Sequence, residues 1–536
     1  MTKNKVINKK DKISRLVLEG NLLKALWIIS LPIIVFNIFK ACFGSVDTFF
    51  GAGLEGATQS YIQFSKSAQS IVEAVGVCLG ITGVALISRE VGKNKNVKSL
   101  KARKIASSVF VLLFIVSLVV ACVMIGFSSP ICSLFLKEKV INGVPKAITT
   151  EEKNLCINAF RLQMLGTILA AINVFFLGIE RILGKLKKIL VLNCIMMGLK
   201  IGLSTLCFGI KVIGLEALCP NVLGLQTASC IAYLFITIVA FFTLFNKKNP
   251  LFLSLGDFSF KTFFQDKKLL KTILKLSITL TIGKFIYEGG RMFTLFMIDS
   301  TFDKPFLAGT PFEFKGLGGL GAIGVADSII TLFAQISFSL KEGQLMIVSE
   351  NLGNKNNKRA IKTLMLVSFC CFLVFAVTYL ICAPKEYCGL GFGDDLCLFF
   401  KNLGKEKKDQ MTLDMFHAKN PEFKSFLLGA LLTTGLLTTQ LEVFSTFLIA
   451  AKQPKYDLLL NFGRVFLFRI PALYFFRNVW FGNEEKTSIK INNAYGFANF
   501  SANFIMLMFM VFVCVRFVCV RFVYKLKKEK QPKSFK

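Results

Sequence analysis

The chain has 536 residues, of which 54% are hydrophobic, and its mean hydropathy of +0.61 excludes a soluble globular protein. Its formal net charge of +33 would indicate nucleic-acid binding if the chain were soluble. Here the charges lie in the connections between apolar segments, so we expect the lipid bilayer as a partner and no nucleic acid.

About twelve apolar segments follow one another along the chain, each long enough to cross the hydrocarbon core of a bilayer. The sequence therefore predicts an all-α integral membrane protein. The basic N-terminal residues precede no small-residue cleavage site, so we expect no removable signal peptide. The spans are expected at residues 22–48, 61–88, 105–136, 154–178, 189–208, 221–245, 272–299, 320–349, 363–383, 425–450, 458–476 and 494–515.

The connections between these spans differ in charge on the two sides of the membrane. With the N-terminus placed inside, the inner connections hold 37 Lys and Arg and the outer ones hold 17. By the positive-inside rule both termini are cytoplasmic, and we expect a multi-pass protein of the plasma membrane. Residues 246–271 mix Lys with Phe and Leu and predict an amphipathic segment on the inner surface, whereas 384–424 form a long polar outer loop.

The first span contains the most informative stretch, Leu31–Gly53, which carries Pro32 near one end and Asp47 near the other. A carboxylate on a spanning helix costs ~2.5–3.5 kcal/mol on insertion scales, so it usually faces a water-filled cavity or a partner. The proline can kink the helix and leave backbone carbonyls free. One interpretation makes Asp47 a site for protons or cations in a transporter; the other leaves it solvated at the end of the helix.

A long-range repeat relates the two halves of the chain. Residues 83–98 read GVALISREVGKNKNVK and residues 344–359 read QLMIVSENLGNKNNKR, and an offset of 261 aligns Ser88 and Gly92 with Ser349 and Gly353. Each motif closes a span that has an even number in its half, so the halves have the same orientation. This predicts two six-helix lobes related by a pseudo-two-fold axis along the membrane normal. The expected parts are a cytoplasmic N-terminus at 1–21, an N-lobe at 22–245, a linker at 246–271, a C-lobe at 272–515 and a basic tail at 516–536.

The two SxxxG helix ends and the LP…VDT pattern of the first span resemble the multidrug and toxic compound extrusion (MATE) transporters of the multidrug/oligosaccharidyl-lipid/polysaccharide exporter (MOP) superfamily. The resemblance implies two lobes around a central cavity that opens alternately to each side. It implies export of small amphipathic compounds by a monomer, coupled to H⁺ or Na⁺ and with no cofactor. Asp47 falls on the coupling aspartate of the first helix, and Asn37 falls on an asparagine common there.

The resemblance also places a glutamate of the C-lobe in the seventh span, where Glu288 is the nearest candidate for coupling. Glu288 and Arg291 are three residues apart and can pair along the helix, so a neutral structural cluster is the alternative. Further candidates for the cavity, each with an equally plausible structural role, are Lys40, Glu73, Asp327 and Glu442.

The fifth span departs from the family pattern. Where the family often has an Asn and an acid four residues later, this chain has Lys200 and Ser204, and Asn193 lies nearly two turns earlier. A lysine near Asp47 would hold that carboxylate ionised and compete with a bound cation. The departure favours protons, a charge-neutral site or a different substrate over sodium.

No motif in the sequence indicates an enzyme. There is no P-loop, nucleophile elbow or HExxH, and the single histidine, His417, has no second ligand nearby. The leading hypothesis is an antiporter that exports amphipathic or cationic compounds in exchange for protons or sodium. The alternative is a flippase for a lipid-linked or amphiphilic anionic substrate, favoured by the Lys and Arg inside the spans; a channel or scaffold is a third possibility. A net-acidic interior predicts organic cations as substrates, and a net-basic interior predicts phosphate-bearing lipids.

Overall fold

The computed structural model describes residues 14–52, 57–94, 99–135, 139–141, 144–146, 149–208, 221–253, 266–299, 320–396, 423–476, 479 and 488–530. Several sequence-predicted residues have side chains outside these described parts, namely Lys40, Asp47, Arg291 and Asp327.

The first half of the structure (the N-half) is formed by long helices and one short helix. They are α2 (Leu22–Ala52), α3 (Ala57–Asn94), α4 (Leu100–Gly126), α5 (Ser128–Phe135), α6 (Thr150–Ile182), α7 (Leu186–Phe208) and α8 (Val222–Leu244). A two-stranded antiparallel hairpin, β1 (Lys139–Ile141) and β2 (Val144–Lys146), precedes α6. Thr149 caps α6 by accepting from the Glu152 N–H, and the Glu152 side chain accepts from the Thr149 N–H, so the sequence itself fixes where this helix begins.

The second half (the C-half) contains two stretches of π-helix. Its elements are α10 (Lys267–Asp299), α11 (Leu320–Gly353), α12 (Asn357–Cys382), η3 (Lys385–Tyr387), α15 (Phe423–Ala430), η5 (Leu431–Thr438), α16 (Thr439–Ala450), α17 (Lys455–Phe462), η6 (Gly463–Arg469), α18 (Ile470–Phe475) and α19 (Ser488–Lys530). The π-helical segments η5 and η6 continue directly from α15 and α17 and lead into α16 and α18. Two of the spans in this half are therefore helices with a local change of register.

The number of spanning helices agrees with the sequence. Among the described residues, ten helical segments are long and apolar enough to cross a membrane. The more highly charged α10 and α11 have 33 and 34 residues and complete a set of twelve. The fold is all-α apart from the hairpin, as predicted.

Most helix ends differ from the prediction by a few residues, as at α3, which ends at Asn94 and not at 88, and three further differences are notable. The third span, expected as one helix at 105–136, breaks at Phe127 between α4 and α5. Pro130 explains the break, because its ring clashes with the carbonyl group four residues earlier and it has no N–H to donate. α12 begins six residues before the expected position 363, and α19 continues past residue 515 to Lys530.

The linker also differs from the expected surface segment where it is described. Leu251 and Leu253 are buried in the main core, and the Arg103 guanidinium of α4 lies 3.7 Å from the centre of the Phe252 ring. The start of the linker therefore packs against the N-half; residues 254–265 lie outside the described part of the chain.

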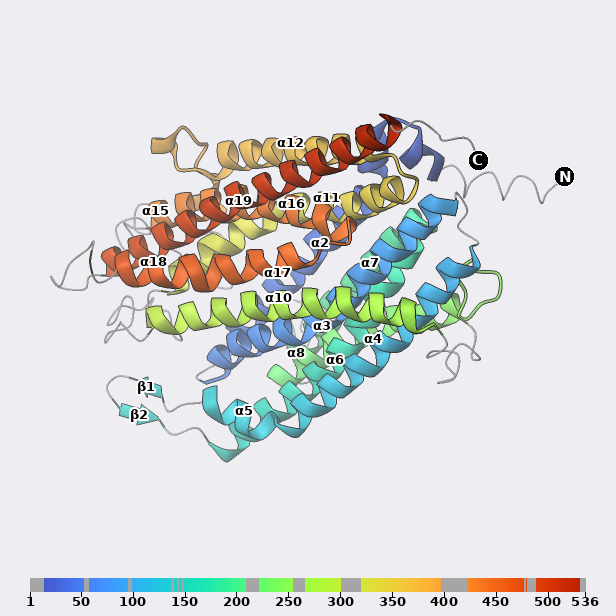
Figure 1. Cartoon of the computed structure of the whole chain (residues 1–536). Helices are drawn as coiled ribbons and strands as arrows, with labels where there is room; N and C mark the ends of the chain where they lie inside the picture. The colour runs from blue at the N-terminus through green and yellow to red at the C-terminus, as the bar shows by residue number, and fades with distance from the viewer. Residues whose placement is uncertain are drawn as a thin grey trace.

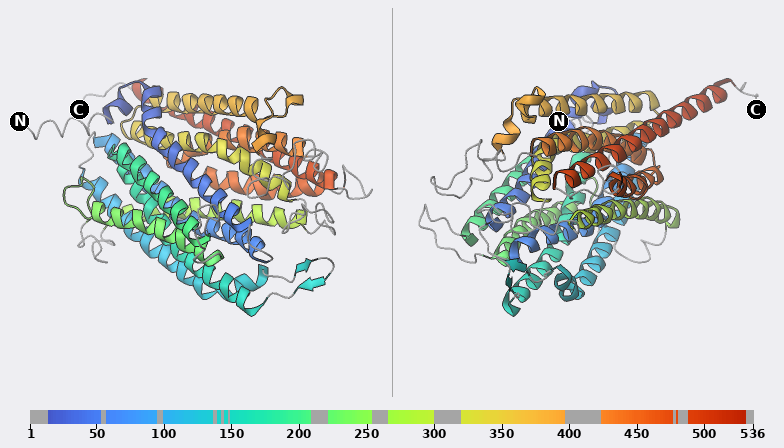
Figure 2. Two further views of the ribbon diagram at one scale, coloured as in Figure 1. Left: turned by 180° about the vertical axis from the view of Figure 1, so that it is seen from behind. Right: turned by 90° about the vertical axis from the view of Figure 1, so that its left-hand side faces the viewer.

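The two halves lie closest at the end of the bundle where residue 14 and the end of α19 are found, which we call the termini face (Figure 1). From there the helices of the N-half and the C-half diverge toward the opposite face, and the view from behind shows the same arrangement (Figures 1 and 2). The largest cluster of buried apolar side chains draws on both halves, including Phe175 of α6 and Phe447 of α16.

The repeat motifs meet at the termini face. A Cβ atom on Gly92 of α3 would lie 2.1 Å from the Glu350 carbonyl oxygen of α11, and one on Gly353 would lie 2.1 Å from the Arg89 carbonyl oxygen. Arg89 and Glu350 are themselves related by the offset of 261. Two copies of one motif therefore make one reciprocal contact, in which each glycine lies against the backbone of the other helix. Ser88 and Ser349 are both fully buried beside it.

The N-terminal segment (residues 14–21) begins the N-half but is bonded to the C-half. Arg359, at the start of α12, donates to the carbonyl oxygens of Leu16, Val17 and Gly20. Asn351 of α11 donates to the Val17 carbonyl, and the Ser14 hydroxyl donates to Glu350 at 2.9 Å. The N-terminal segment is thus held against α11 and α12 at the termini face, where the glycine contact also lies.

Candidate functional site

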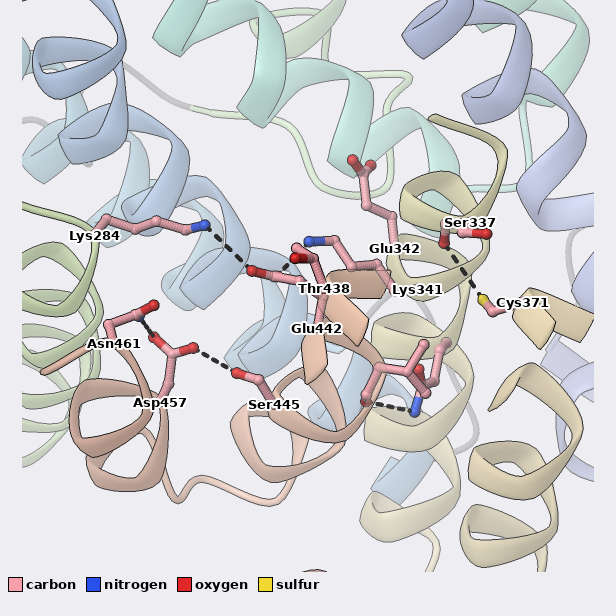
Figure 3. Close-up of polar contacts among 12 residues, drawn as sticks. Lys284, Ser337, Lys341, Glu342, Cys371, Thr438, Glu442, Ser445, Asp457 and Asn461 are labelled. Carbon is pink, nitrogen blue, oxygen red and sulfur yellow. Dashed lines mark hydrogen bonds and ion pairs between the residues drawn. The ribbon is translucent and has the colours of Figure 1, made fainter. Parts of the chain in front are cut away.

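The candidate site is a group of charged side chains inside the C-half, drawn in Figure 3. The carboxylate of Glu442 (α16) lies 2.5 Å from the Lys341 ammonium (α11) and 3.8 Å from the Lys284 ammonium (α10). The side chains of these three residues are 18%, 19% and 30% exposed, so they are mostly removed from solvent. One carboxylate is therefore shared by two lysines that come from two other helices.

A second acid lies beside this group. Asp457 of α17 is 5% exposed and accepts a hydrogen bond from the Ser445 hydroxyl and another, at 3.3 Å, from the Asn461 amide. Figure 3 shows these partners on the side of Glu442 that faces α17. The position of Asp457 was predicted in an inner connection, but its carboxyl group is buried in the C-half.

Two arginines of η6 extend the group. Arg464 and Arg469 are 3% and 4% exposed, and Arg464 donates to the Thr438 hydroxyl at the end of η5 over 2.8 Å. Their guanidinium carbons lie 4.6 and 5.9 Å from the centre of the Tyr287 ring of α10, within the range of a cation–π interaction. The group around Glu442 thus has four basic side chains, two lysines and two arginines, against three acids, Glu288, Glu442 and Asp457.

The adjacent residues Lys341 and Glu342 connect this group to the N-half. Successive helix positions point in different directions, and Glu342 accepts from Arg181 of α6 at 3.2 Å and from Asn37 of α2 at 3.3 Å. Asn37 also donates to the Ser339 hydroxyl at 3.0 Å. Asn37, predicted as a cavity residue of the N-lobe, therefore bonds across to the C-half.

The remaining candidates of the N-half lie apart from the charged group. Glu73 accepts from Gln69 on its own helix at 2.6 Å, and Gln163 donates to Gln69 from α6. Lys200 is fully buried and donates to the Leu225 carbonyl oxygen at 3.1 Å and to the Ser229 hydroxyl of α8.

Asn193 is fully buried on α7, and neither polar atom of its amide has a hydrogen-bond partner in the described part of the protein. Within those residues no group of three His, Cys, Asp or Glu side chains is placed to hold a metal ion.

Sequence reasoning missed Asp457, Arg464 and Arg469. Two arginines five residues apart in the apolar run 458–476 were a visible signal. On an α-helix such residues lie about 140° apart around the axis, so the pattern gave no reason to group them.

Comparisons with solved structures identify the fold. An outward-facing multidrug resistance MATE family transporter of the MOP superfamily is 16% identical, with a TM-score of 0.69 over 94% of this chain and 97% of its own. A MATE structure in the bent conformation is 15% identical, with the same TM-score and coverage. No protein-family model matches the sequence, and no curated protein matches it.

A third similar structure bears on function. It is a MOP superfamily transporter from Pyrococcus furiosus, 16% identical, with a TM-score of 0.69 over 93% of this chain and 97% of its own. That transporter is described as having a binding pocket of reverse polarity, which suggests a different function for it. Together these likenesses confirm the predicted fold: the chain has the two-lobed, twelve-helix fold of MATE transporters.

Proposed function

We propose that the protein is a secondary transporter that moves an amphiphile with an acidic head group across the membrane by alternating access. The observation that carries the proposal is the Glu442 carboxylate shared by Lys284 and Lys341. With Arg464 and Arg469 nearby, the group around Glu442 is net basic, and a net-basic site favours an anionic substrate.

In this proposal Glu442 is an internal counter-ion. Two lysines held in the low dielectric of a membrane protein need a negative partner, and in the absence of substrate Glu442 is that partner. An acidic head group can take its place, because phosphate and carboxylate groups accept the same charge-assisted hydrogen bonds. Return of Glu442 to the lysines then favours release of the substrate.

The arrangement of the two halves supports alternating access. The glycine contact between α3 and α11 holds the halves together at the termini face, and the helices diverge toward the opposite face (Figure 1). If the termini are cytoplasmic, as the charge of the connections predicts, this is an outward-facing state. The likeness to an outward-facing MATE transporter supports the same orientation.

The membrane potential is a sufficient driving force for export of an anion. An inside-negative potential favours outward movement of one negative charge by about 2.3 kcal/mol per 100 mV. The likeness to a MOP transporter with reversed pocket polarity supports a departure from cation export.

The second candidate is efflux of amphipathic cations in exchange for H⁺ or Na⁺, with Asp47 of α2 as the coupling site. The likeness to a multidrug resistance transporter favours it. Under this alternative Glu442 would be neutralised by its lysines and would take no part in coupling.

Reconstitution in liposomes separates the two candidates. One set of vesicles contains a fluorescent phosphatidylglycerol whose outward movement is followed under an imposed membrane potential; the other contains a fluorescent organic cation under an H⁺ or Na⁺ gradient. We expect the lipid to move and the cation to stay, Glu442→Gln to alter lipid movement, and Asp47→Asn to leave it unchanged. Cation efflux that depends on Asp47 and on one ion gradient would overturn the proposal and establish the antiporter.

A further inference from the structure

The C-half contains a pair of buried arginines that form no direct ion pair with the shared carboxylate. Arg464 and Arg469 both belong to η6, the π-helical segment Gly463–Arg469. Hydrogen bonds in a π-helix join residues five apart, so Arg469 lies one turn from Arg464 and on the same face, whereas an α-helix would separate them. The change of register thus brings both guanidinium groups to the ring of Tyr287.

A second π-helical segment lies against the first at this point. η5 ends at Thr438, whose hydroxyl accepts from Arg464 over 2.8 Å. π-Helical turns are rare and are frequently found at functional sites, because the extra residue reorients side chains at a cost in stability. Here η6 carries both arginines, and η5, on another span, supplies the Thr438 hydroxyl that accepts from Arg464.

The two guanidinium groups are not directly paired with an acid in the described residues, although Glu442 and Glu288 attract Arg464 from a longer distance. Neither forms an ion pair with a described carboxylate, and the Nε atom of each is buried without a hydrogen-bond partner there. Each is less than 5% exposed, and they repel one another. With four basic side chains against three acids, the group keeps an excess positive charge in the protein interior, which is expensive to maintain, so the arrangement is explained best by an anion that binds there.

We propose that Arg464 and Arg469, together with Tyr287, bind the phosphate group of the substrate. This inference rests on the proposed transport of an anionic amphiphile and assigns its head group to a second site, beside the Lys284–Glu442–Lys341 group. Guanidinium groups suit phosphate because their planar set of N–H donors can pair with two oxygens at once. Tyr287 fixes the position of both groups through its ring.

Binding measurements on the intact protein test the inference. The protein is placed in nanodiscs of phosphatidylcholine, and binding of short-chain phosphatidic acid is measured by native mass spectrometry, with inorganic phosphate as a second probe. We expect Arg469→Gln to weaken binding of phosphatidic acid by about tenfold or more, because hydrogen bonds to charged groups are among the stronger ones. The affinity of Arg469→Lys for phosphatidic acid should lie between those of the native protein and Arg469→Gln, since lysine keeps the charge and loses the planar donor set.

The matched control is Arg516→Gln, which removes an exposed arginine of α19 in the same half and should leave binding unchanged. Competition by inorganic phosphate at equal strength would identify a site for free phosphate, and binding of the lipid alone would identify a head-group site; both support the inference. Native affinity in Arg469→Gln would overturn it.

Thermal unfolding covers the case in which a variant folds poorly. Without ligand, Arg469→Gln should melt at or above the temperature of the native protein, because it removes the excess buried positive charge of the group, and phosphatidic acid should no longer stabilise it. A clear fall in melting temperature without ligand would show a structural role and overturn the inference. If native protein binds the lipid but does not move it in liposomes, the site stands and the proposed transport fails.

Discussion

The N-half and the C-half have the same number of long helices and very different interiors. In the N-half most of the described polar contacts join amides and hydroxyls, such as Gln69–Gln163 and Asn173–Thr237, and the ion pairs of buried Glu180 with Lys185 and Lys188 lie at the end of α6. In the C-half, charged side chains meet and two spans change to π-helical register. The internal repeat therefore supplies a common frame, and under the proposed function the head group of the substrate is bound in the second half.

The largest effect that we expect, and the strongest test of this contrast, is the loss of stability when the shared carboxylate is removed. Glu442→Ala leaves Lys284 and Lys341 without a counter-ion, so we expect a loss of about 3 kcal/mol in stability, measured by thermal or denaturant unfolding in detergent. The matched change in the N-half, Glu73→Gln, replaces an acceptor bonded to Gln69 and should cost about 1 kcal/mol.

The double variant Glu442→Gln with Lys341→Gln provides the control for the loss of charge balance. It should recover part of the stability, because one uncompensated charge is removed with its partner. Equal effects of Glu442→Ala and Glu73→Gln would contradict the contrast between the halves.

A smaller effect should show where the halves are alike. Gly92→Ala and Gly353→Ala each introduce a Cβ atom about where a carbonyl oxygen of the opposite helix lies. Each should lower the stability of the closed termini face by about 1–3 kcal/mol, the range for overpacked sites. The measurement is the distance between spin labels on α3 and α11, which should increase to the same extent in both variants.

Gly202→Ala on α7 is the control, since nothing lies within 4 Å of its added Cβ atom. If the distance between the spin labels increased in only one of the two glycine variants, the two glycines would not contribute equally to the contact.

The smallest predicted effect concerns the N-terminal segment and its pH dependence. Glu350 lies in the last turn of α11 at the termini face, beyond the end of the predicted span (320–349), and its burial raises the pKa of its carboxyl group to about 8, whereas the hydrogen bond from the Ser14 hydroxyl acts to lower it. When the segment is released, the carboxyl group is solvated and its pKa returns to about 4.5.

Between these two values the docked state binds more protons than the released state, so docking weakens as the pH rises from about 4.5 to about 8. Among the described acids and bases, none forms an ion pair with Glu350 that would oppose this. A nitroxide at residue 19 should become more mobile as the pH rises, and Glu350→Gln should abolish the dependence. A response that persists in Glu350→Gln would assign it to another group.

The sequence predicted the frame of the protein better than its chemistry. Runs of apolar residues locate the spans because the bilayer imposes a minimum length, and the positions of Lys341 and Glu342 on different faces follow from helix periodicity alone. The repeat also identified Gly92 and Gly353, although only the structure shows that they contact each other's helix.

The charged site was predicted less well, for two physical reasons. A π-helical turn has no signature in apolar spacing, so the grouping of Arg464 with Arg469 could not be foreseen. Partners that lie far apart in sequence, such as Asn37 and Glu342, depend on how the halves pack. Glu442 was a candidate from its residue type, but its two lysine partners come from helices that only the folded chain brings together.

The bonds of the N-terminal segment have a consequence for the order of assembly in the membrane. The two side-chain donors to the Val17 carbonyl, Asn351 and Arg359, are 334 and 342 positions away in the sequence, so neither exists until the end of α11 has been made. The full set of bonds to the segment forms only after the start of α12 has also left the ribosome. Docking of the first residues is therefore one of the late steps in biogenesis, and a chain truncated before α12 would leave its N-terminus open to proteases.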